Sequence, residues 1–274
     1  HELRRLSGTK FEPRLVEARS KACAQSEMVW REARAKSDFR LLQPFLQIVL
    51  DLTREAGQAK AAALGCPLYD ALLDEYEPGG QAGRIDALFA ELEAFLPTLL
   101  REALETQNRR GPPLAFEGPF PIEAQRALGV RFMDAIGFDF TRGRLDVSLH
   151  PFTGGTPGDV RITTRYDEAD FLRSLMGVLH ETGHALYEAG LPADWRLQPV
   201  GSACGMTLHE SQSLLLEMQA CRGPQFAAFA APRLRAAFGR DGPAWSEDNV
   251  LRALTTVKPG FIRVDADEVT YPLH

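Results

Sequence analysis

The stretch from Phe171 to Ala189 places two histidines and a glutamate inside one apolar helical pattern, in the run HETGH at residues 180–184. An α-helix advances about 100° per residue, so side chains four positions apart lie almost above one another. His180 and His184 can therefore reach the same metal ion, while Glu181 points to one side of it. Because buried imidazoles need polar partners, the fold has to bring further polar groups to this helix.

This arrangement is typical of a metal-dependent hydrolase. A zinc ion held by two neutral imidazoles and one carboxylate keeps a fourth position for water, and lowers the pKa of that water from about 16 toward about 7. Glu181 would then accept the proton of the water as it attacks a carbonyl, and would pass it to the leaving nitrogen. The alternative is an amphipathic helix that binds nothing, because a pattern with two free positions also arises by chance.

The ends of this helix are marked in the sequence as well. Asp167 is expected to cap its start, with Asp170 at capping-box spacing three residues later. Gly190 and Pro192 suit its end. The two histidines are therefore predicted to lie in the middle of a buried helix.

A third ligand is expected from a second amphipathic helix, predicted around residues 207–217. Glu210 and Glu217 are seven positions apart and share one face of it, so either could point toward the first helix. Glu217 would more often be a solvated or capping carboxylate, whereas Glu210 lies beside His209 and Gln212 in a polar cluster. We therefore favour Glu210 as the ligand, and His209 remains open as a ligand or an outer partner.

Residues 144–150 and 159–165 alternate apolar and polar side chains, which predicts a short antiparallel pair of strands around the Gly- and Pro-rich loop 151–158. An edge strand beside the metal helix could hold an extended peptide through its backbone. A purely structural hairpin is an equal alternative. His150, at a strand end, could be an outer partner of the metal, but a structural histidine is the commoner outcome.

Helical patterns dominate the rest of the chain, at residues 13–36, 39–64, 85–108, 122–136 and 249–257. Several of them exceed the average helix length. No repeat and no shift in composition separates one region from another. The sequence therefore predicts a mainly α fold, one domain over residues 1–274, with a small antiparallel β-sheet beside the helix that carries residues 180–184.

The composition favours a soluble protein that binds neither nucleic acid nor membranes. Its 31 basic and 37 acidic residues give a net charge of -6, and the two kinds are interleaved on helix faces. The four cysteines are scattered without paired metal spacing, as expected of reduced thiols. No apolar stretch is long enough for a membrane span and none resembles a signal peptide, so we expect a cytoplasmic protein.

Several separated segments resemble the M32 metallocarboxypeptidases, the group that includes carboxypeptidase Taq. The similar runs follow one order along the chain: residues 150–152 (HPF), 159–164 (DVRITT), 180–188 (HETGHALYE), 209–212 (HESQ) and 262–267 (IRVDAD). Residues 29–34 and 69–78 are also similar to that family. The resemblance therefore covers nearly the whole chain.

This resemblance implies a helical zincin-type metallopeptidase domain that removes single residues from the free C-terminal ends of peptides. It implies Zn²⁺, or Co²⁺ or another divalent metal, as the cofactor. It implies His180, His184 and Glu210 as the metal ligands, in agreement with the choice of Glu210 above, and Glu181 as the general base. It also implies a homodimer.

A carboxypeptidase has to bind a free carboxylate, and a guanidinium does this through two parallel hydrogen bonds. Arg263, in the IRVDAD run, is the candidate that the resemblance favours. Arg161 and Arg165, on the predicted strand, are alternatives, although both could pair with local acidic residues. Arg263 itself could pair with Asp265 or Asp267 in a purely structural ion pair.

One departure from the family pattern lies at the C-terminal side. Members of the family continue beyond the run that ends here at residues 271–274. Their later Gly-x-x-Gln-Asp-x-His-Trp pattern is missing from this sequence. The resemblance implies that this pattern supplies hydrogen-bond donors to the oxyanion formed during the reaction. We expect the sequence to lack N-terminal and C-terminal segments of the family. Two alternatives to an active carboxypeptidase stay open, namely a non-catalytic or weakly active metal-binding protein, and a zinc endopeptidase.

Overall fold

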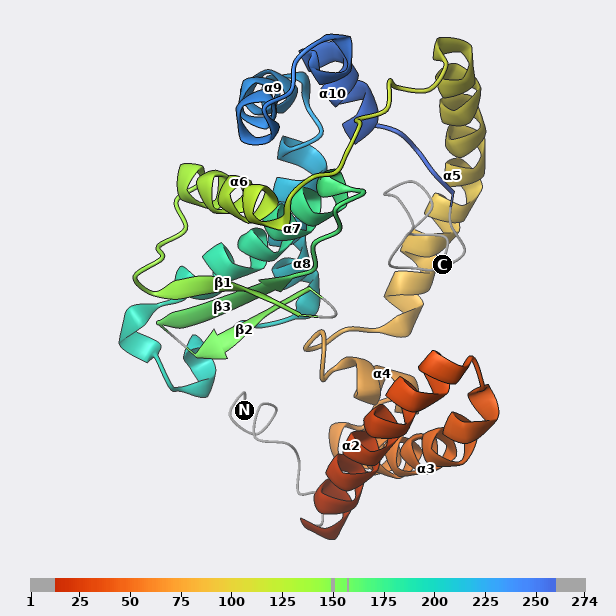
Figure 1. Cartoon of the computed structure of the whole chain (residues 1–274). Helices are drawn as coiled ribbons and strands as arrows, with labels where there is room; N and C mark the ends of the chain where they lie inside the picture. Colours follow the sequence, from red (N-terminus) through yellow and green to blue (C-terminus); the bar gives the residue numbers. More distant parts are fainter. Residues whose placement is uncertain (1–12, 149–150, 157, 260–274) are drawn as a thin grey trace. The chain divides into compact units, whose positions relative to one another are not determined.

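The computed structural model describes residues 13–148, 151–156 and 158–259. The described chain is mainly α-helical with one small sheet, as predicted (Figure 1). It divides into two compact units, with the boundary in the sequence between Asp86 and Ala87. One domain over residues 1–274 stays a prediction. No helix in the described ranges is long and apolar enough to cross a membrane.

The first unit is built from helices α2 (Pro13–Lys36), α3 (Phe39–Leu64) and α4 (Leu68–Leu73), followed by the start of α5 (Ala82–Arg110). The bounds of α2 and α3 are those predicted. Asp38 caps α3 by accepting a hydrogen bond from the backbone N–H of Arg40. Gly65 ends α3 with a φ of 67°, which glycine adopts without strain. These marked ends explain why the bounds could be predicted.

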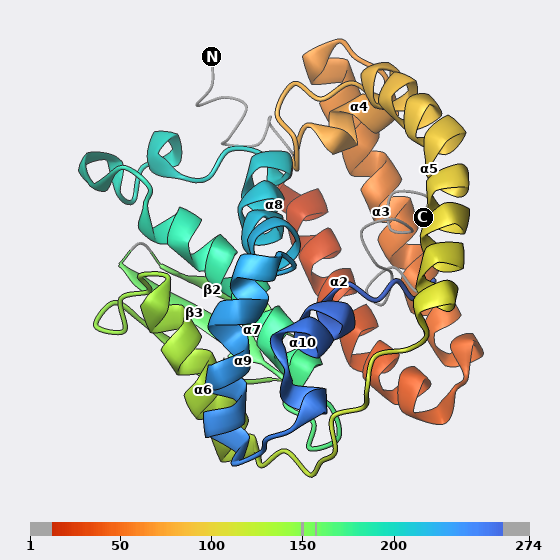
Figure 2. The same cartoon turned by 90° about the horizontal axis from the view of Figure 1, so that it is seen from above.

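The second unit holds the remainder of α5, one sheet and a group of helices around it. In chain order its elements are α6 (Ile122–Ala135), β1 (Gly143–Val147), β2 (Phe152–Thr156), β3 (Asp159–Thr164), α7 (Phe171–Ala189), the 3-10 turns η1 (Ala193–Trp195) and η2 (Pro199–Gly201), α8 (Met206–Leu214), the π-helical turn η3 (Leu215–Ala220), α9 (Pro224–Phe238), the 3-10 turn η4 (Pro243–Trp245) and α10 (Glu247–Leu254). Figure 2 shows α9 between α6 and α10.

The sheet has the strand order β1-β3-β2. β1 pairs with β3 in parallel, whereas β2 pairs with β3 in antiparallel orientation and places Thr153 opposite Ile162. The predicted antiparallel pairing of residues 144–150 with 159–165 is therefore wrong. The antiparallel partner is β2, in the segment predicted to be a loop. With five residues and two adjacent glycines, β2 is too short and too poor in apolar side chains to show strand alternation.

Helix α7 forms the centre of the second unit. On one side, Leu175 and Leu179 join a core cluster with α6, α9 and α10. On another side, Val178 packs with Leu145 of β1 and Ile162 of β3. Because these contacts bury most of the surface of α7, its position is fixed against the sheet and the neighbouring helices (Figure 1).

Candidate active site

Helix α7 begins one residue after its cap and ends where the sequence predicts. Asp170 accepts a hydrogen bond from the backbone N–H of Arg173 at 3.2 Å, so it is the N-cap. The prediction of Asp167 as the cap is wrong, because this residue accepts from the N–H of Ala169 in the preceding turn. Gly190 follows the last helical residue, as expected. His180 and His184 therefore lie in the middle of a well-defined helix.

The two positions inside the HETGH run pack the helix rather than remain free. The Thr182 side chain is fully buried and donates a hydrogen bond to the carbonyl of Val178 at 2.6 Å. A Cβ atom at Gly183 would overlap the carbonyl oxygen of Gln212 and lie 2.6 Å from Cα of Ser213. Only a glycine lets the backbones of α7 and α8 come so close, and this approach brings the side chains of α8 to the imidazoles.

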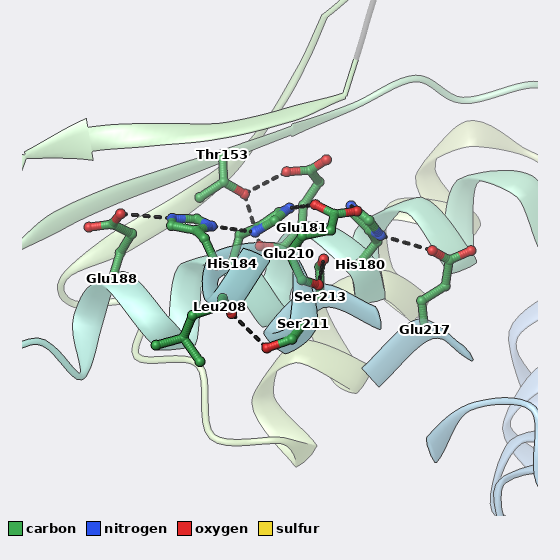
Figure 3. Close-up of polar contacts among 11 residues, drawn as sticks. Thr153, His180, Glu181, His184, Glu188, Leu208, Glu210, Ser211, Ser213 and Glu217 are labelled. Atoms are coloured by element: carbon green, nitrogen blue, oxygen red, sulfur yellow. Dashed lines mark hydrogen bonds and ion pairs between the residues drawn. The ribbon is translucent and has the colours of Figure 1, made fainter. Parts of the chain in front are cut away.

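Three potential metal-binding side chains meet between α7 and α8 (Figure 3). Nε2 of His180 lies 3.7 Å from Oε1 of Glu210, and Nε2 of His184 lies 3.2 Å from Oε2 of Glu210. One donor atom from each of the three residues lies within 4.8 Å of the others. The His184 side chain is 11% exposed and that of Glu210 is 39% exposed, so the cluster is open to solvent on the side of Glu210.

This donor set fits a tetrahedral divalent ion. Ligand atoms about 2.0–2.2 Å from a tetrahedral zinc lie on the order of 3.4 Å apart, and the two separations from Glu210 lie on either side of that value. Two imidazoles and one carboxylate leave a fourth position for water or substrate, as in hydrolytic sites. Within the described ranges, this is the one group of three or more such side chains.

In both imidazoles, the Nδ1 atom contacts another residue, while the Nε2 atom faces Glu210. Nδ1 of His180 lies 2.8 Å from Oε2 of Glu217, whose other oxygen pairs with Arg222 at 3.2 Å. Nδ1 of His184 lies 2.7 Å from Nδ1 of His209, and Nε2 of His209 lies 2.9 Å from Oε1 of Glu188. These contacts turn the Nε2 atom of each ring toward Glu210 (Figure 3).

The carboxylate of Glu181 lies on the side of the sheet. The hydroxyl of Thr153, on edge strand β2, lies 2.7 Å from Oε2 of Glu181 and 2.9 Å from its backbone oxygen. Glu181 is buried. The carboxylate is therefore held at the junction of α7 and β2, next to the group of ligand atoms but outside it (Figure 3).

The charges of the site shift the pKa values of two of its groups. Burial alone would lower the pKa of His180, but its hydrogen bond to Glu217 and the negative charges of Glu217, Glu210 and Glu181 raise it overall. The close contact with His184 lowers the pKa of Glu210 against the opposing effect of burial, and the electrostatic effect of both histidines adds to the lowering. The lowered pKa of Glu210 favours the ionised carboxylate that a metal ligand requires.

The proposed carboxylate-binding residues are not brought to this cluster in the described part of the chain. Arg161 lies opposite Gly154 and next to Ile162 on β3. Because the Ile162 side chain packs against α7 and successive side chains of a strand point to opposite faces, Arg161 points to the other face of the sheet. There it pairs with Asp159 at 2.7 Å. Arg165 is exposed. Arg263 and His150 lie outside the described residues.

Sequence reasoning missed the observed roles of four residues around the cluster, namely Thr153, Gly183, Glu188 and Glu217. Glu217 was expected as a ligand or a solvated group, but it contacts the back of His180. The spacing of seven from Glu210 did signal that both carboxylates face α7. Glu188 also follows His184 by four residues, a helical spacing that could have indicated a shared partner. Thr153 and Gly183 depend on which segments pack together, which no local pattern gives.

The family model described as carboxypeptidase Taq (M32) metallopeptidase matches residues 4–274 of this chain. Among curated proteins, the thermostable carboxypeptidase 1 of Thermus thermophilus is 42% identical over 269 residues, which are 95% of this chain and 52% of that protein. Carboxypeptidase 1 of Bacillus subtilis is 38% identical over 258 residues, 92% of this chain and 50% of that protein. The chain thus spans about half the length of the curated relatives it matches.

Solved structures show the same similarity in three dimensions. Metallocarboxypeptidase 1 of Trypanosoma cruzi superimposes with a TM-score of 0.89 at 45% identity, over 96% of this chain and 53% of that one. The M32 carboxypeptidase of Deinococcus radiodurans superimposes with a TM-score of 0.86 at 36% identity, over 97% of this chain and 53% of that one. The fold described above is therefore shared with these proteins.

Proposed function

The chain belongs to the carboxypeptidase Taq (M32) metallopeptidase family, and we propose that it acts as a metal-dependent carboxypeptidase that releases C-terminal residues from peptides. The resemblance predicted from the sequence runs is thereby confirmed. The observation that carries the proposed activity is the meeting of His180, His184 and Glu210, with the carboxylate of Glu181 beside them. Because the chain spans about half the length of its relatives, the activity of the whole protein is part of the proposal.

In this proposal, His180, His184 and Glu210 hold the divalent ion. A bound ion of this kind supplies Lewis acidity, which polarises a carbonyl and lowers the pKa of a coordinated water. Glu181 accepts a proton from the attacking water and delivers it to the leaving nitrogen, so the peptide C–N bond breaks as the new C–O bond forms. Thr153 keeps the Glu181 carboxylate on the sheet side through its hydroxyl.

The peptide would lie along β2. This strand is at the edge of the sheet and, through Thr153, contacts the proposed base, so an extended substrate chain could pair with its backbone next to Glu181. Backbone pairing accepts many side chains, so we expect a broad specificity. The free carboxylate at the end of the peptide requires a cation, and we assign that role to Arg263, because Arg161 points to the opposite face of the sheet.

Zinc is the proposed ion, with cobalt as the alternative, since imidazole and carboxylate ligands bind several divalent metals. A homodimer and a cytoplasmic location are also part of the proposal. The location is supported by the four cysteines, all of which are free thiols, because disulfides persist mainly in oxidising compartments.

Hydrolysis of paired peptides tests the proposed function. The chain loaded with zinc is expected to remove the last residue of a peptide with a free C-terminus, and to leave the same peptide intact when its C-terminus is amidated. Mass spectrometry of the products checks both expectations. Cleavage of the amidated peptide at internal bonds would instead indicate an endopeptidase. Bound zinc without hydrolysis of either peptide would indicate a non-catalytic metal-binding protein.

Replacing Arg263 by Ala is expected to raise KM for peptides with a free C-terminus, with little change in metal content. The loss of a bidentate pair between a guanidinium and a carboxylate removes two charge-assisted hydrogen bonds, each worth about 1.5–3 kcal/mol. Steady-state kinetics and elemental analysis of the same preparation measure the two quantities. Arg161→Ala is the matched control, and it should leave KM unchanged. If KM rose for Arg161→Ala and not for Arg263→Ala, Arg161 would be the residue that binds the substrate carboxylate.

A further inference from the structure

We propose that His209 and Glu188 act as positioning residues for His184, and that they fix which ring nitrogen of His184 faces the metal. This inference rests on the proposed function in one respect, because it takes His184 as a metal ligand. The observation behind it is a continuous chain of contacts that links two helices: Glu188 and His184 lie on α7, and His209, on α8, contacts both of them.

The direction of this hydrogen-bond chain follows from which atoms can donate. An ionised carboxylate only accepts, so Nε2 of His209 has to carry the hydrogen that faces Oε1 of Glu188 at 2.9 Å. Nδ1 of a neutral His209 then carries a lone pair. Because the two Nδ1 atoms lie 2.7 Å apart, the hydrogen between them belongs to His184. The Nε2 lone pair of His184 consequently faces Glu210, as a metal ligand requires.

The packing around His209 keeps its ring in this orientation. Its ring centre lies 4.7 Å from that of His184 and 5.1 Å from that of Tyr187, which meets it edge-on at 81°. Most of the His209 side chain is shielded from solvent. The ring therefore cannot turn without breaking the contact to Glu188 or the contact to His184.

The other imidazole is held in a different way. His180 contacts the carboxylate of Glu217 directly, and Glu217 is braced by Arg222, which also donates to the carbonyl of Leu254 at 2.6 Å. A carboxylate accepts in either orientation, so it needs no further residue to set its direction. An imidazole in the same place needs a further partner, since one of its nitrogens donates and the other accepts, and the partner decides which. This difference explains why His209 is followed by Glu188.

The zinc affinity of variants of the whole chain tests this inference, measured by competition with a chelator. His209→Phe keeps the aromatic contact with Tyr187 but removes the acceptor, and it is expected to bind Zn²⁺ about 10- to 100-fold more weakly. His209→Asn can place its side-chain oxygen where Nδ1 lies, so it should keep an affinity close to that of the unchanged chain. Equal losses in both variants, or none in His209→Phe, would overturn the inference.

A double-mutant cycle separates a relay from simple packing. Glu188→Leu is expected to weaken Zn²⁺ binding in the unchanged chain and to have no further effect in the His209→Phe background, because Glu188 acts through His209. Glu188 is 36% exposed, so its replacement does not disturb the core, and thermal unfolding of each variant checks this. An undiminished effect in the His209→Phe background would contradict the relay. Zinc binding without peptide hydrolysis would contradict the proposed function but leave this result interpretable.

Discussion

Replacing Glu181 by Gln is expected to lower kcat by about 100- to 10,000-fold, the range that a positioned general base contributes. The amide has the shape of the carboxylate but cannot accept a proton from water. Its oxygen can still accept the hydrogen bond from Thr153, which lies 2.7 Å from Oε2 of Glu181, so the side chain should keep its place. KM and metal content should therefore change little, because Glu181 lies outside the three-residue cluster.

The same preparation has to provide kinetics, metal content and a melting temperature. Elemental analysis should find as much zinc in Glu181→Gln as in the unchanged chain, and the melting temperature should be similar. Loss of zinc together with activity would mean that Glu181 acts through the metal cluster and not as the base. A variant that hydrolyses the peptide at the original rate would remove Glu181 from the mechanism.

The helices could be predicted because both their periodicity and their ends are local. The predicted bounds of residues 13–36, 39–64 and 171–189 agree with α2, α3 and α7. The ends carry their own signals, such as Gly65 at the end of α3. The sequence does not distinguish Asp167 from Asp170 as the cap of α7, because both have the right side-chain chemistry and only the backbone decides which of them reaches the first turn.

The sheet could not be predicted to the same degree, because strand pairing depends on segments that are distant in sequence. The patterns of residues 144–150 and 159–165 indicated two strands, but a period of two says nothing about their relative direction. β2, with Gly154 and Gly155, carries no alternation, although it supplies Thr153. The same period decides the position of Arg161, since a neighbour of buried Ile162 has to point to the other face.

In the site, too, the local geometry could be predicted and the contacts between distant segments could not. His180 and His184 follow from one helical turn, and the structure brings Glu210 to both of them. What the sequence could not give is the close approach of α8 at Gly183, which decides which face of α8 meets the imidazoles. His209 and Glu210 of α8 and Glu217 of η3 all contact the histidines of α7.

Replacing Glu210 by Gln is expected to cost more metal affinity than any change in the outer contacts. An uncharged amide is a much poorer ligand than a carboxylate, and both Nε2 atoms would lose the acceptor that lies 3.7 Å and 3.2 Å from them. The loss should exceed the roughly 10- to 100-fold that follows the removal of an outer partner. Peptide hydrolysis should disappear with the metal and should not return at high zinc concentration.

Glu217→Gln is the matched control, because Glu217 and Glu210 contact the same histidine. Glu217 contacts Nδ1 of His180, whereas Glu210 faces its Nε2. Its amide oxygen can still accept from Nδ1 of His180, which now lies 2.8 Å from Oε2. Zinc affinity should therefore fall by only about 10-fold, and saturating zinc should restore hydrolysis. Chelator competition and kinetics at high zinc distinguish the two variants. If Glu217→Gln lost its zinc while Glu210→Gln kept it, the third ligand would be Glu217, and the orientation proposed for His180 would have to be reversed.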